Sequence, residues 1–205
     1  MKRLSTDETV AALRRGEVVA VPTDTVYGVA ARFDDPVAVA RLFVVKSRPS
    51  HVALPVLVGS VSDVTSLGVD FPAAANLLAE RFWPGALTIV VDATPDVASR
   101  VGAQHSLGLR APRHAGLAAI IAQCGPLAVT SANEHGRSPC VSAEDVIATT
   151  WAAPIAGVLD GGRCDGAVSS VVVLSSDGWR LRRRGVVTSA QLEAVLGPES
   201  PTRDR

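Results

Sequence analysis

Segments expected to form helices alternate with short apolar segments expected to form strands along the whole chain, and this alternation limits the possible folds. The strand segments are rich in branched apolar residues, whereas the helix segments carry apolar residues at helical spacing. Such alternation is typical of an α/β domain, in which helices pack on a β-sheet. Because 205 residues can bury one substantial core, we expect one α/β domain, a mixed twisted β-sheet flanked by helices.

The expected element boundaries follow from caps, turns and prolines. A capping-box pattern at Ser5–Glu8 opens a helix that should stop at Gly16. Further helices are expected at Pro36–Val45, Pro72–Phe82, Ala115–Cys124, Ser142 to about Thr150, and Ser189–Leu196. Strands are expected at Val18–Val21, Val56–Val58, Leu87–Val91, Leu107–Arg110, Leu127–Thr130, Ile155–Leu159, Val171–Leu174 and Trp179–Arg182. The last two strands should pair through the Asp177–Gly178 turn.

The composition, 47% hydrophobic and 20% charged, is that of a globular protein. The segment Met1–Glu8 is polar and lacks the apolar stretch of a signal peptide, and no apolar run approaches the roughly 20 residues that span a bilayer. No metal-site spacing links the dispersed cysteines and histidines, which are Cys124, Cys140, Cys164, His51, His105, His114 and His135. We therefore expect a cytoplasmic protein with reduced thiols, no membrane association and no bound metal.

The domain should occupy residues 1–197, and we expect residues 198–205, a polar stretch after the last helix, to form a disordered tail. The formal net charge is zero, so no global basic field attracts the molecule to nucleic acid. A contact with RNA would need a local patch, for which the sequence offers Arg180, Arg182, Arg183 and Arg184. A solvated strand end is an equally good interpretation of that cluster.

The rarest residue types of the chain lie in its most motif-like segments. Lys46 is one of two lysines in a chain with eighteen arginines, Asn133 is one of two asparagines, and Tyr27 is the single tyrosine. An ammonium group is a compact point charge that often binds phosphate, whereas guanidinium is a planar fork. Retention of Lys46 against this arginine bias indicates a phosphate-binding role, and a surface lysine kept by chance is the alternative.

Polar residues gather where the expected strands end, which is where ligands of open α/β sheets tend to bind. The loop Pro22–Gly28 lies beside an apolar strand and contains four polar side chains, Thr23, Asp24, Thr25 and Tyr27. Such groups need partners if buried, and a polar ligand could supply them. An ordinary turn is the alternative interpretation. Lys46 and Arg48 lie two residues apart, so on an extended segment they would point to one side as paired cations.

Two later segments carry further candidates. Ser131 and Asn133 offer neutral hydrogen bonds suited to a nucleotide or to capping a turn. Arg110 could bind a carboxylate through two N–H donors. The sequence contains no GxxxxGK[ST] and no GxGxxG, so neither common nucleotide-binding fingerprint applies.

Taken in order, these segments resemble the YrdC-like family of threonylcarbamoyl-AMP synthases, in its short, single-domain form. The resemblance extends from Val18 to Gly185 and rests on PTDTVYGVA, KSRP, PVLVGS, FWPGALTIVV, LGLRAP, PLAVTSAN followed by HGRSP, SSVVV and RRRG. In that family a Lys-x-Arg and Ser-x-Asn tetrad marks the synthases, and here the tetrad is Lys46, Arg48, Ser131 and Asn133. YciO-like relatives lack a full tetrad. The longer members carry a C-terminal domain, for which we expect no room in this chain.

The resemblance implies a nucleotidyltransferase that makes threonylcarbamoyl-AMP and pyrophosphate from L-threonine, bicarbonate and ATP with Mg²⁺, without a tightly bound cofactor or metal site. A partner tRNA threonylcarbamoyl transferase complex would then modify adenosine 37 of tRNA, which the synthase itself could also contact. Lys46 and Arg48 would be catalytic. The implied threonine-binding residues are Thr25, Tyr27, Arg110 and Ser169, and the implied nucleotide-binding residues are Lys46, Arg48, Ser106, Ser131, Asn133 and Arg183.

Several positions depart from the family pattern. Ser47 stands where Gly or Asn is common, Ala53 replaces a proline, Val52 and Leu57 replace polar residues, and His135 replaces a serine. Two other functions stay open. One is a non-catalytic RNA-binding or ribosome-maturation module of the YciO-like type, and the other is an enzyme that acts on a different carbamoyl adenylate.

Overall fold

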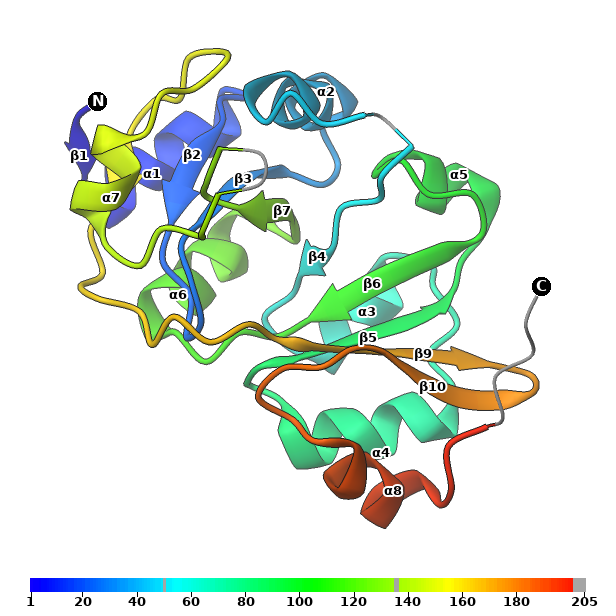
Figure 1. The fold of residues 1–205 in the computed structure, drawn as a ribbon. Coiled ribbons are helices and arrows are strands. Elements are labelled where there is room, and N and C mark those ends of the chain that lie inside the picture. The colour runs from blue at the N-terminus through cyan, green and yellow to red at the C-terminus, as the bar shows by residue number, and fades with distance from the viewer. Residues whose placement is uncertain (50, 135–136, 201–205) are drawn as a thin grey trace.

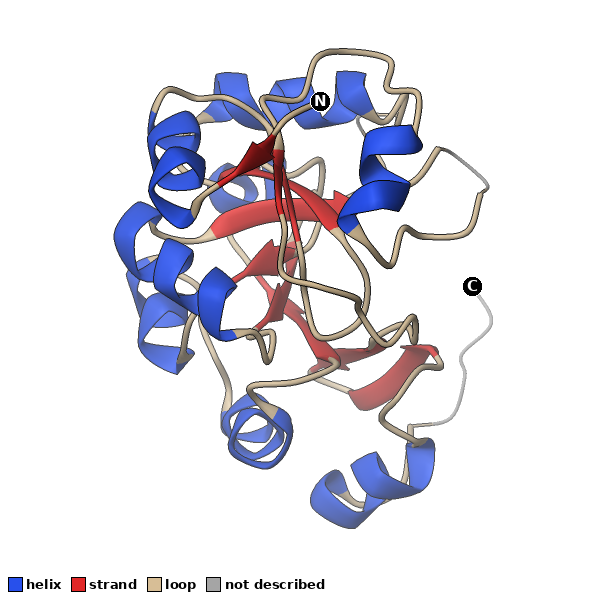
Figure 2. Ribbon diagram, turned by 90° about the vertical axis from the view of Figure 1, so that its left-hand side faces the viewer, coloured by secondary structure: helices blue, strands red, loops and turns tan. Residues whose placement is uncertain are grey.

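The computed structural model describes residues 1–49, 51–134 and 137–200. These residues form a mixed sheet in the order β1-β8-β2-β3-β7-β4-β6-β5-β9-β10, with helices packed against it (Figures 1 and 2). The strands are β1 (Arg3–Leu4), β2 (Val19–Val21), β3 (Gly28–Arg32), β4 (Val56–Leu57), β5 (Leu87–Asp92), β6 (Ser106–Arg110), β7 (Leu127–Ser131), β8 (Val158–Leu159), β9 (Ser170–Ser175) and β10 (Gly178–Arg183). The expected α/β class and mixed, helix-flanked sheet are confirmed.

The helices are α1 (Thr6–Arg14), α2 (Pro36–Val45), α3 (Val61–Ser66), α4 (Ala73–Phe82), α5 (Pro95–Ser99), α6 (Ala115–Cys124), α7 (Ala143–Ala148) and α8 (Ser189–Leu196). Local caps explain their starts. Ser5 and Glu8 form the expected capping box of α1. The Asp35 side chain accepts from the backbone N–H groups of Val37 and Ala38, with Pro36 at the first helical position of α2.

Some elements differ from the expectations. Strand β3 was not expected, because Gly28–Arg32 contains glycine and two alanines and lacks the branched pattern of its neighbours. It forms because it pairs with β2 on one side and with β7 on the other, and both are antiparallel to it. The short elements β1, α3 and α5 were also not expected. The strand expected at Ile155–Leu159 is limited to Val158–Leu159.

Side-chain alternation along the strands divides the core into two layers. Val19 and Val21 of β2 join the smaller apolar cluster, which α1 and α6 cover, whereas Ala20 joins the larger cluster on the opposite face. All the other helices with buried apolar residues contribute them to the larger cluster. The smaller cluster ends near Leu57 and Val129. One face of the sheet is therefore covered by helices only over its β1-to-β7 half.

The chain end described by the structure lies along strand β10 at the sheet edge. The Ser200 backbone N–H donates to the Trp179 carbonyl oxygen at 3.0 Å, and the Leu181 N–H donates to Glu199 Oε1 at 2.7 Å. The disorder expected for 198–205 stays a prediction for residues 201–205, which lie outside the described residues. Within the described part of the chain, no helix combines the length and the apolar character that crossing a membrane requires.

Candidate functional site

A cavity of about 630 Å³ lies on the half of the sheet face that α1 and α6 leave open. Its lining follows the two-residue period of the strands, because Ser106, Gly108 and Arg110 of β6 all face it while Leu107 and Leu109 enter the core. The neighbouring strands add side chains in register. Thr88 and Val90 come from β5, Val129 and Ser131 from β7, and Val171 from β9. The sheet therefore provides the cavity floor.

Arg110 is a buried cation held by three partners. Its Nη2 donates to Asp24 Oδ1 at 2.6 Å, its Nη1 to Thr25 Oγ1 at 3.1 Å, and its Nε to the Gly85 carbonyl oxygen at 2.9 Å. Burial lowers the pKa of Arg110, and the Asp24 carboxylate acts in the opposite direction. A guanidinium has five N–H donors, so two have no partner among the described residues and remain for a ligand. A Cβ on Gly85 would lie 2.6 Å from the Phe82 carbonyl oxygen, which explains the glycine after Trp-Pro.

The loop between β2 and β3 brings two buried hydroxyl groups to the cavity. Thr23 Oγ1 lies 2.9 Å from Thr25 Oγ1 and donates to the Val26 carbonyl oxygen at 2.7 Å. Tyr27 also lines the cavity, but its hydroxyl donates to the Gly162 carbonyl oxygen at 2.8 Å. The loop ends at Gly28, the first residue of β3. This position requires glycine, because a Cβ there would lie 2.6 Å from Val129 Cγ1 on the adjacent strand. The contribution of Tyr27 to ligand binding stays a prediction, and any such contact would involve the ring.

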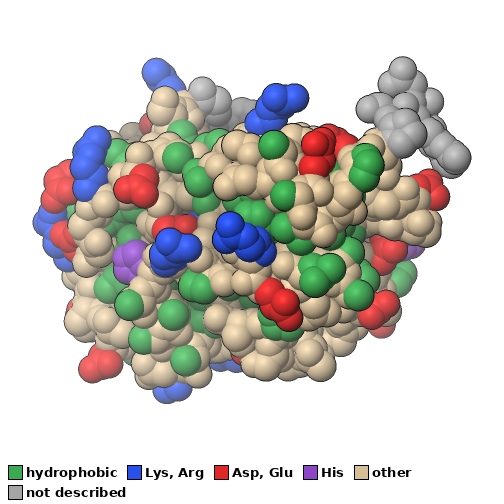
Figure 3. Space-filling model, turned by 90° about the horizontal axis from the view of Figure 1, so that it is seen from below, with side chains coloured by type: hydrophobic (Ala, Val, Ile, Leu, Met, Phe, Trp, Pro, Cys, Tyr) green, Lys and Arg blue, Asp and Glu red, His purple; other side chains and the backbone are tan. Residues whose placement is uncertain are grey.

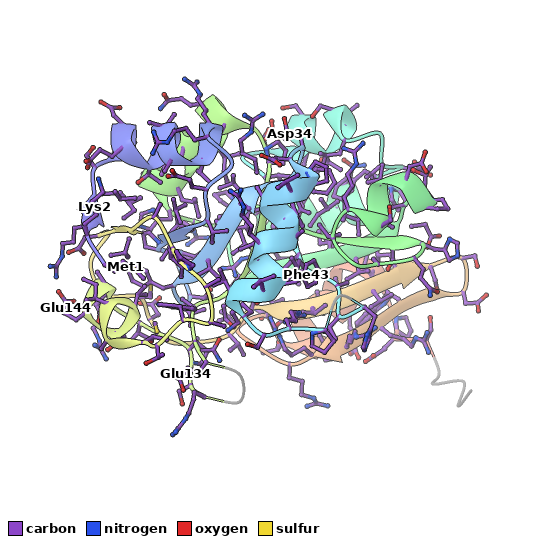
Figure 4. The ribbon with its side chains drawn as sticks, turned by 90° about the horizontal axis from the view of Figure 1, so that it is seen from above. Met1, Lys2, Asp34, Phe43, Glu134 and Glu144 are labelled. Atoms are coloured by element: carbon purple, nitrogen blue, oxygen red, sulfur yellow. The ribbon has the colours of Figure 1, made fainter. Side chains whose placement is uncertain are left out.

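Helix α2 ends in a turn that places Lys46 and Arg48. The Arg48 N–H donates to the Phe43 carbonyl oxygen at 2.9 Å and the Ser47 N–H to that of Val44 at 3.0 Å, as in a Schellman motif. Ser47 has a φ of 47°, in the left-handed region that favours Gly or Asn. The expectation of an extended Lys46–Arg48 segment is therefore wrong. Figure 4 shows α2 crossing the view, with Phe43 on its C-terminal half.

Lys46 is 7% exposed and is held by neutral oxygens. Its Nζ donates to the carbonyl oxygen of Asn133 and, at 2.8 Å, to Asn133 Oδ1. The Ser131 hydroxyl donates to the same Oδ1 at 2.7 Å, so three of the tetrad residues form one hydrogen-bonded group at the end of β7. Burial and, second, the positive charge of Arg48 lower the pKa of Lys46 to about 8. Lys46 and Asn133 border the cavity rather than line it.

Arg48 lines the cavity and holds the segment that follows it. Its Nε donates to the Val52 carbonyl oxygen at 2.8 Å, and its Nη2 to that of Ala53 at 2.9 Å. Val52, Ala53 and Leu57 are departures from the family pattern, and all three line the cavity with apolar surface. His135, another departure, lies outside the described residues.

Ser169 and Arg183 also line the cavity and contact each other. Arg183 Nη2 donates to Ser169 Oγ at 2.8 Å, and its Nε to the Ser169 carbonyl oxygen at 3.0 Å. Ser169 Oγ also lies 3.3 Å from Thr88 Oγ1. A Cβ on Gly185 would lie 2.3 Å from the Val168 carbonyl oxygen, so this glycine allows the two segments to approach closely. Arg183 therefore orients Ser169.

Every residue proposed from the sequence lies at this one cavity or on its border, and its role in ligand binding stays a prediction. Sequence reasoning missed Thr88, Gly108 and Arg182 as lining residues. A threonine inside an apolar strand was the available signal for Thr88, and a small residue between two leucines was the signal for Gly108.

The charge of the lining is one-sided. Among the described residues that line the cavity, Arg48, Arg110, Arg182 and Arg183 are cations and none is Asp or Glu, although Asp24 pairs with Arg110. Lys46 adds a further cation at the border. Such a site can hold a polyanion, and the hydroxyl-lined Arg110 side can also bind a carboxylate.

Comparison with known proteins gives a family match over most of the chain. The family model Sua5/YciO/YrdC, described as telomere recombination, matches residues 11–185. Threonylcarbamoyl-AMP synthase of Bacillus subtilis (strain 168) is 40% identical over 195 residues, covering 93% of this chain and 56% of that protein. This chain thus spans about half the length of that relative. A relative from Mycobacterium tuberculosis (strain H37Rv) is 36% identical over 193 residues, covering 93% of this chain and 88% of the relative.

A solved structure agrees in fold. The crystal structure of P. abyssi Sua5 complexed with L-threonine matches this chain with a TM-score of 0.85 and 32% sequence identity. The match covers 96% of this chain and 59% of the P. abyssi chain. The YrdC-like architecture expected from the sequence is therefore confirmed.

Proposed function

The chain belongs to the Sua5/YciO/YrdC family, and we propose that it is an L-threonylcarbamoyladenylate synthase, a nucleotidyltransferase. The proposed reaction converts L-threonine, bicarbonate and ATP into threonylcarbamoyl-AMP and pyrophosphate, and ATP enters as its magnesium complex. The name of the Bacillus subtilis relative and the threonine complex of the P. abyssi protein support this proposal.

The observation that carries the proposal is the joining of the tetrad at one cationic cavity. Lys46 and Ser131 both bond to Asn133, although Lys46 and Asn133 are 87 positions apart, and Arg48 lines the same cavity. The reaction must hold a triphosphate, a one-carbon anion and an amino acid carboxylate close together. A lining with four arginines and without Asp or Glu among its described residues suits these anions.

In this mechanism the protein acts through position and charge, and no covalent enzyme intermediate is required. Lys46 has three N–H donors and two go to Asn133, which leaves one for a phosphate or the carbamate. Among the described residues, the hydrogen-bond partners of the buried ammonium are neutral, so an anionic ligand would supply its counter-charge. Ser131 and Asn133 hold Lys46 in place, and Arg48 neutralises the phosphates beside it.

The threonine end is proposed at Arg110. Two of its N–H donors have no partner among the described residues and would bind the α-carboxylate, and Thr25 and Ser169 would supply hydroxyl groups near the substrate. The Asp24 carboxylate opposes the lowering of the Arg110 pKa that burial causes and holds the guanidinium in place. Ser106 and Arg183 complete the nucleotide side.

The product would pass to a tRNA threonylcarbamoyl transferase complex for modification of adenosine 37. The proposal includes a cytoplasmic location, where tRNA and ATP are available. Because an adenylate with a carbamate is reactive, transfer to that partner should follow synthesis without delay.

Pyrophosphate release from ATP by the purified chain tests the proposal. Release should require both L-threonine and bicarbonate, and mass spectrometry should detect threonylcarbamoyl-AMP. The two asparagines offer a matched pair, since Asn133 holds Lys46 whereas Asn76 bonds to the Phe71 and Pro72 carbonyl oxygens at the start of α4. Asn133→Ala should reduce the rate of pyrophosphate release about 10–100-fold, as expected for loss of a group that orients a charge. Asn76→Ala should leave that rate unchanged.

Release that continues without threonine would contradict the amino acid assignment. A chain that binds ATP but releases no pyrophosphate with any of the substrates would instead favour the non-catalytic alternative.

A further inference from the structure

Two consecutive residues of β10, Arg182 and Arg183, both line the cavity, which a regular strand would not allow. The register explains this exception. Leu181 pairs with Val172 and Arg183 pairs with Val171, so Arg182 is an extra residue opposite the β9 ladder. Such a bulge directs an additional side chain to one face and is common beside active sites.

The two arginines differ in what already holds them. Arg183 bonds twice to Ser169, through Nε at 3.0 Å and Nη2 at 2.8 Å. Arg182 is exposed, and no side-chain hydrogen bond or ion pair engages it within the described part of the chain. Arg182 can therefore give all five N–H donors to a ligand.

The charge of the cavity indicates which ligand. Arg110 is paired with Asp24, so this pair adds no net positive charge to the cavity, and its remaining N–H donors suit the carboxylate of an amino acid whose own ammonium group balances the charge. Arg48, Arg182 and Arg183 lack a carboxylate partner among the described residues. Three such cations exceed the need of a single carboxylate and match the several negative charges of a triphosphate.

We infer that Arg182 is an anion-binding residue for the terminal phosphates of the nucleoside triphosphate, brought to the cavity by the β10 bulge. This inference rests on the proposed function, because it assigns a residue to the nucleotide that the reaction consumes. The group it contacts leaves as pyrophosphate.

The four arginines at the end of β10 could instead form a nucleic-acid patch, and they differ in whether they reach the cavity. They are Arg180, Arg182, Arg183 and Arg184. Arg180 lies on the same strand and is exposed, as is Arg184 just beyond the strand, but neither lines the cavity. The face seen from below carries basic, acidic and apolar side chains interspersed (Figure 3). Within this cluster, a contact specific to the cavity should therefore depend on Arg182 and Arg183 and not on Arg180 or Arg184.

Direct binding measurements test the inference without turnover. Isothermal titration at low salt would compare ATP, AMP and inorganic tripolyphosphate on wild-type protein, Arg182→Ala and Arg182→Lys. Arg180→Ala and Arg184→Ala serve as matched controls of equal charge loss. Arg182→Ala should weaken ATP and tripolyphosphate about 3–10-fold, as for a partly exposed charge contact, and AMP less than 2-fold. Arg182→Lys should recover part of the loss, and the controls should change ATP affinity less than 2-fold.

Three results would overturn the inference. Equal weakening by all three arginine-to-alanine variants would show a diffuse field, and equal loss of AMP and ATP would remove the terminal phosphates as the target. Loss of tRNA binding in all three variants with unchanged ATP affinity would make the strand a nucleic-acid surface. Wild-type protein that binds ATP through Arg182 yet releases no pyrophosphate would refute the proposed reaction and keep this inference.

Discussion

The two halves of one sheet face follow the same strand periodicity, but helices cover one half and the cavity lies on the other. Over the half formed by β2, β3 and β7, the side chains on this face are apolar, such as Val19, Val21 and Ala30. Helices α1 and α6 pack on them and bury them. Over the β6 and β5 half, the outward positions hold Ser106, Gly108, Arg110 and Thr88, and the cavity lies there. Whether the residues at every second strand position are apolar, or are polar or small, therefore decides whether a helix packs on that part of the sheet or a ligand cavity forms there. Substitutions in the covered half should therefore affect stability, and those around the open half should affect activity.

The largest effect is expected in the covered half. Ile120 of α6 is fully buried in the smaller cluster. Ile120→Ala should lower the free energy of unfolding by about 2–5 kcal/mol through lost burial and a cavity. Chemical denaturation measures this, and pyrophosphate release per folded molecule should stay at the wild-type level. A specific activity that falls with stability would break the separation of the two halves.

On the cavity side, Lys46→Ala should reduce adenylate formation by about 10²–10³-fold, or roughly 2.7–4 kcal/mol of transition-state stabilisation, by analogy with removal of an oxyanion-hole donor. Lys2, the other lysine, is exposed and pairs with Glu8, so Lys2→Ala is the matched control. Thermal unfolding of Lys46→Ala should show little loss of stability, because burial disfavours the ammonium charge in the folded state and its hydrogen-bond partners among the described residues are neutral. Near-normal pyrophosphate release by Lys46→Ala would exclude Lys46 from the mechanism.

Arg110→Lys should raise the threonine requirement about 10-fold and the ATP requirement less, since lysine keeps the charge but loses the planar fork. Separate titrations of threonine and ATP against both proteins measure this. Equal losses for both ligands would make Arg110 a structural residue that holds Asp24 and Gly85 together. A larger increase in the ATP requirement would mean that threonine and ATP were assigned to the wrong ends of the cavity.

The pKa of Lys46, lowered to about 8, predicts opposite trends for activity and stability. An anion needs the charged form, so activity that depends on Lys46 should fall as the pH rises through about 8. Between that value and the ordinary lysine pKa of about 10.5, the unfolded chain binds more protons than the folded chain, so this residue makes stability rise with pH. Paired activity and denaturation measurements across this range test both trends, and Lys46→Met should remove both. Parallel trends in wild-type protein would contradict the assignment.

The smallest effect is expected at the turn that presents the cations to the cavity. Ser47→Gly should raise the free energy of unfolding by about 0.5–1 kcal/mol, because the left-handed conformation suits glycine and the entropy cost offsets part of the gain. Differential scanning calorimetry would detect it. Ser99→Gly, at the end of α5, is a control that should destabilise instead. A loss of stability in Ser47→Gly would mean that the serine side chain contributes at this turn.

Local signals predicted much of the fold. The bounds of α2 and α6 match the sequence expectation, because caps and apolar spacing define them within a few residues. Strand β3 was missed because its pairing partners, rather than its own residues, stabilise it. The same holds within the site. Rarity identified Lys46 and Asn133, but their contact with each other depends on the sheet order, as does the bulge at Arg182.

Glu199 and Ser200 have a consequence for handling this protein. An edge strand with free backbone groups is a template for pairing with another molecule, and proteins block such edges. Here the two residues engage the Leu181 N–H and the Trp179 carbonyl of β10, while the opposite edge, β1, is only Arg3–Leu4. Trimming the chain after Gly197 would free those two backbone groups. The shortened protein should then self-associate more readily at high concentration, with its cavity still formed.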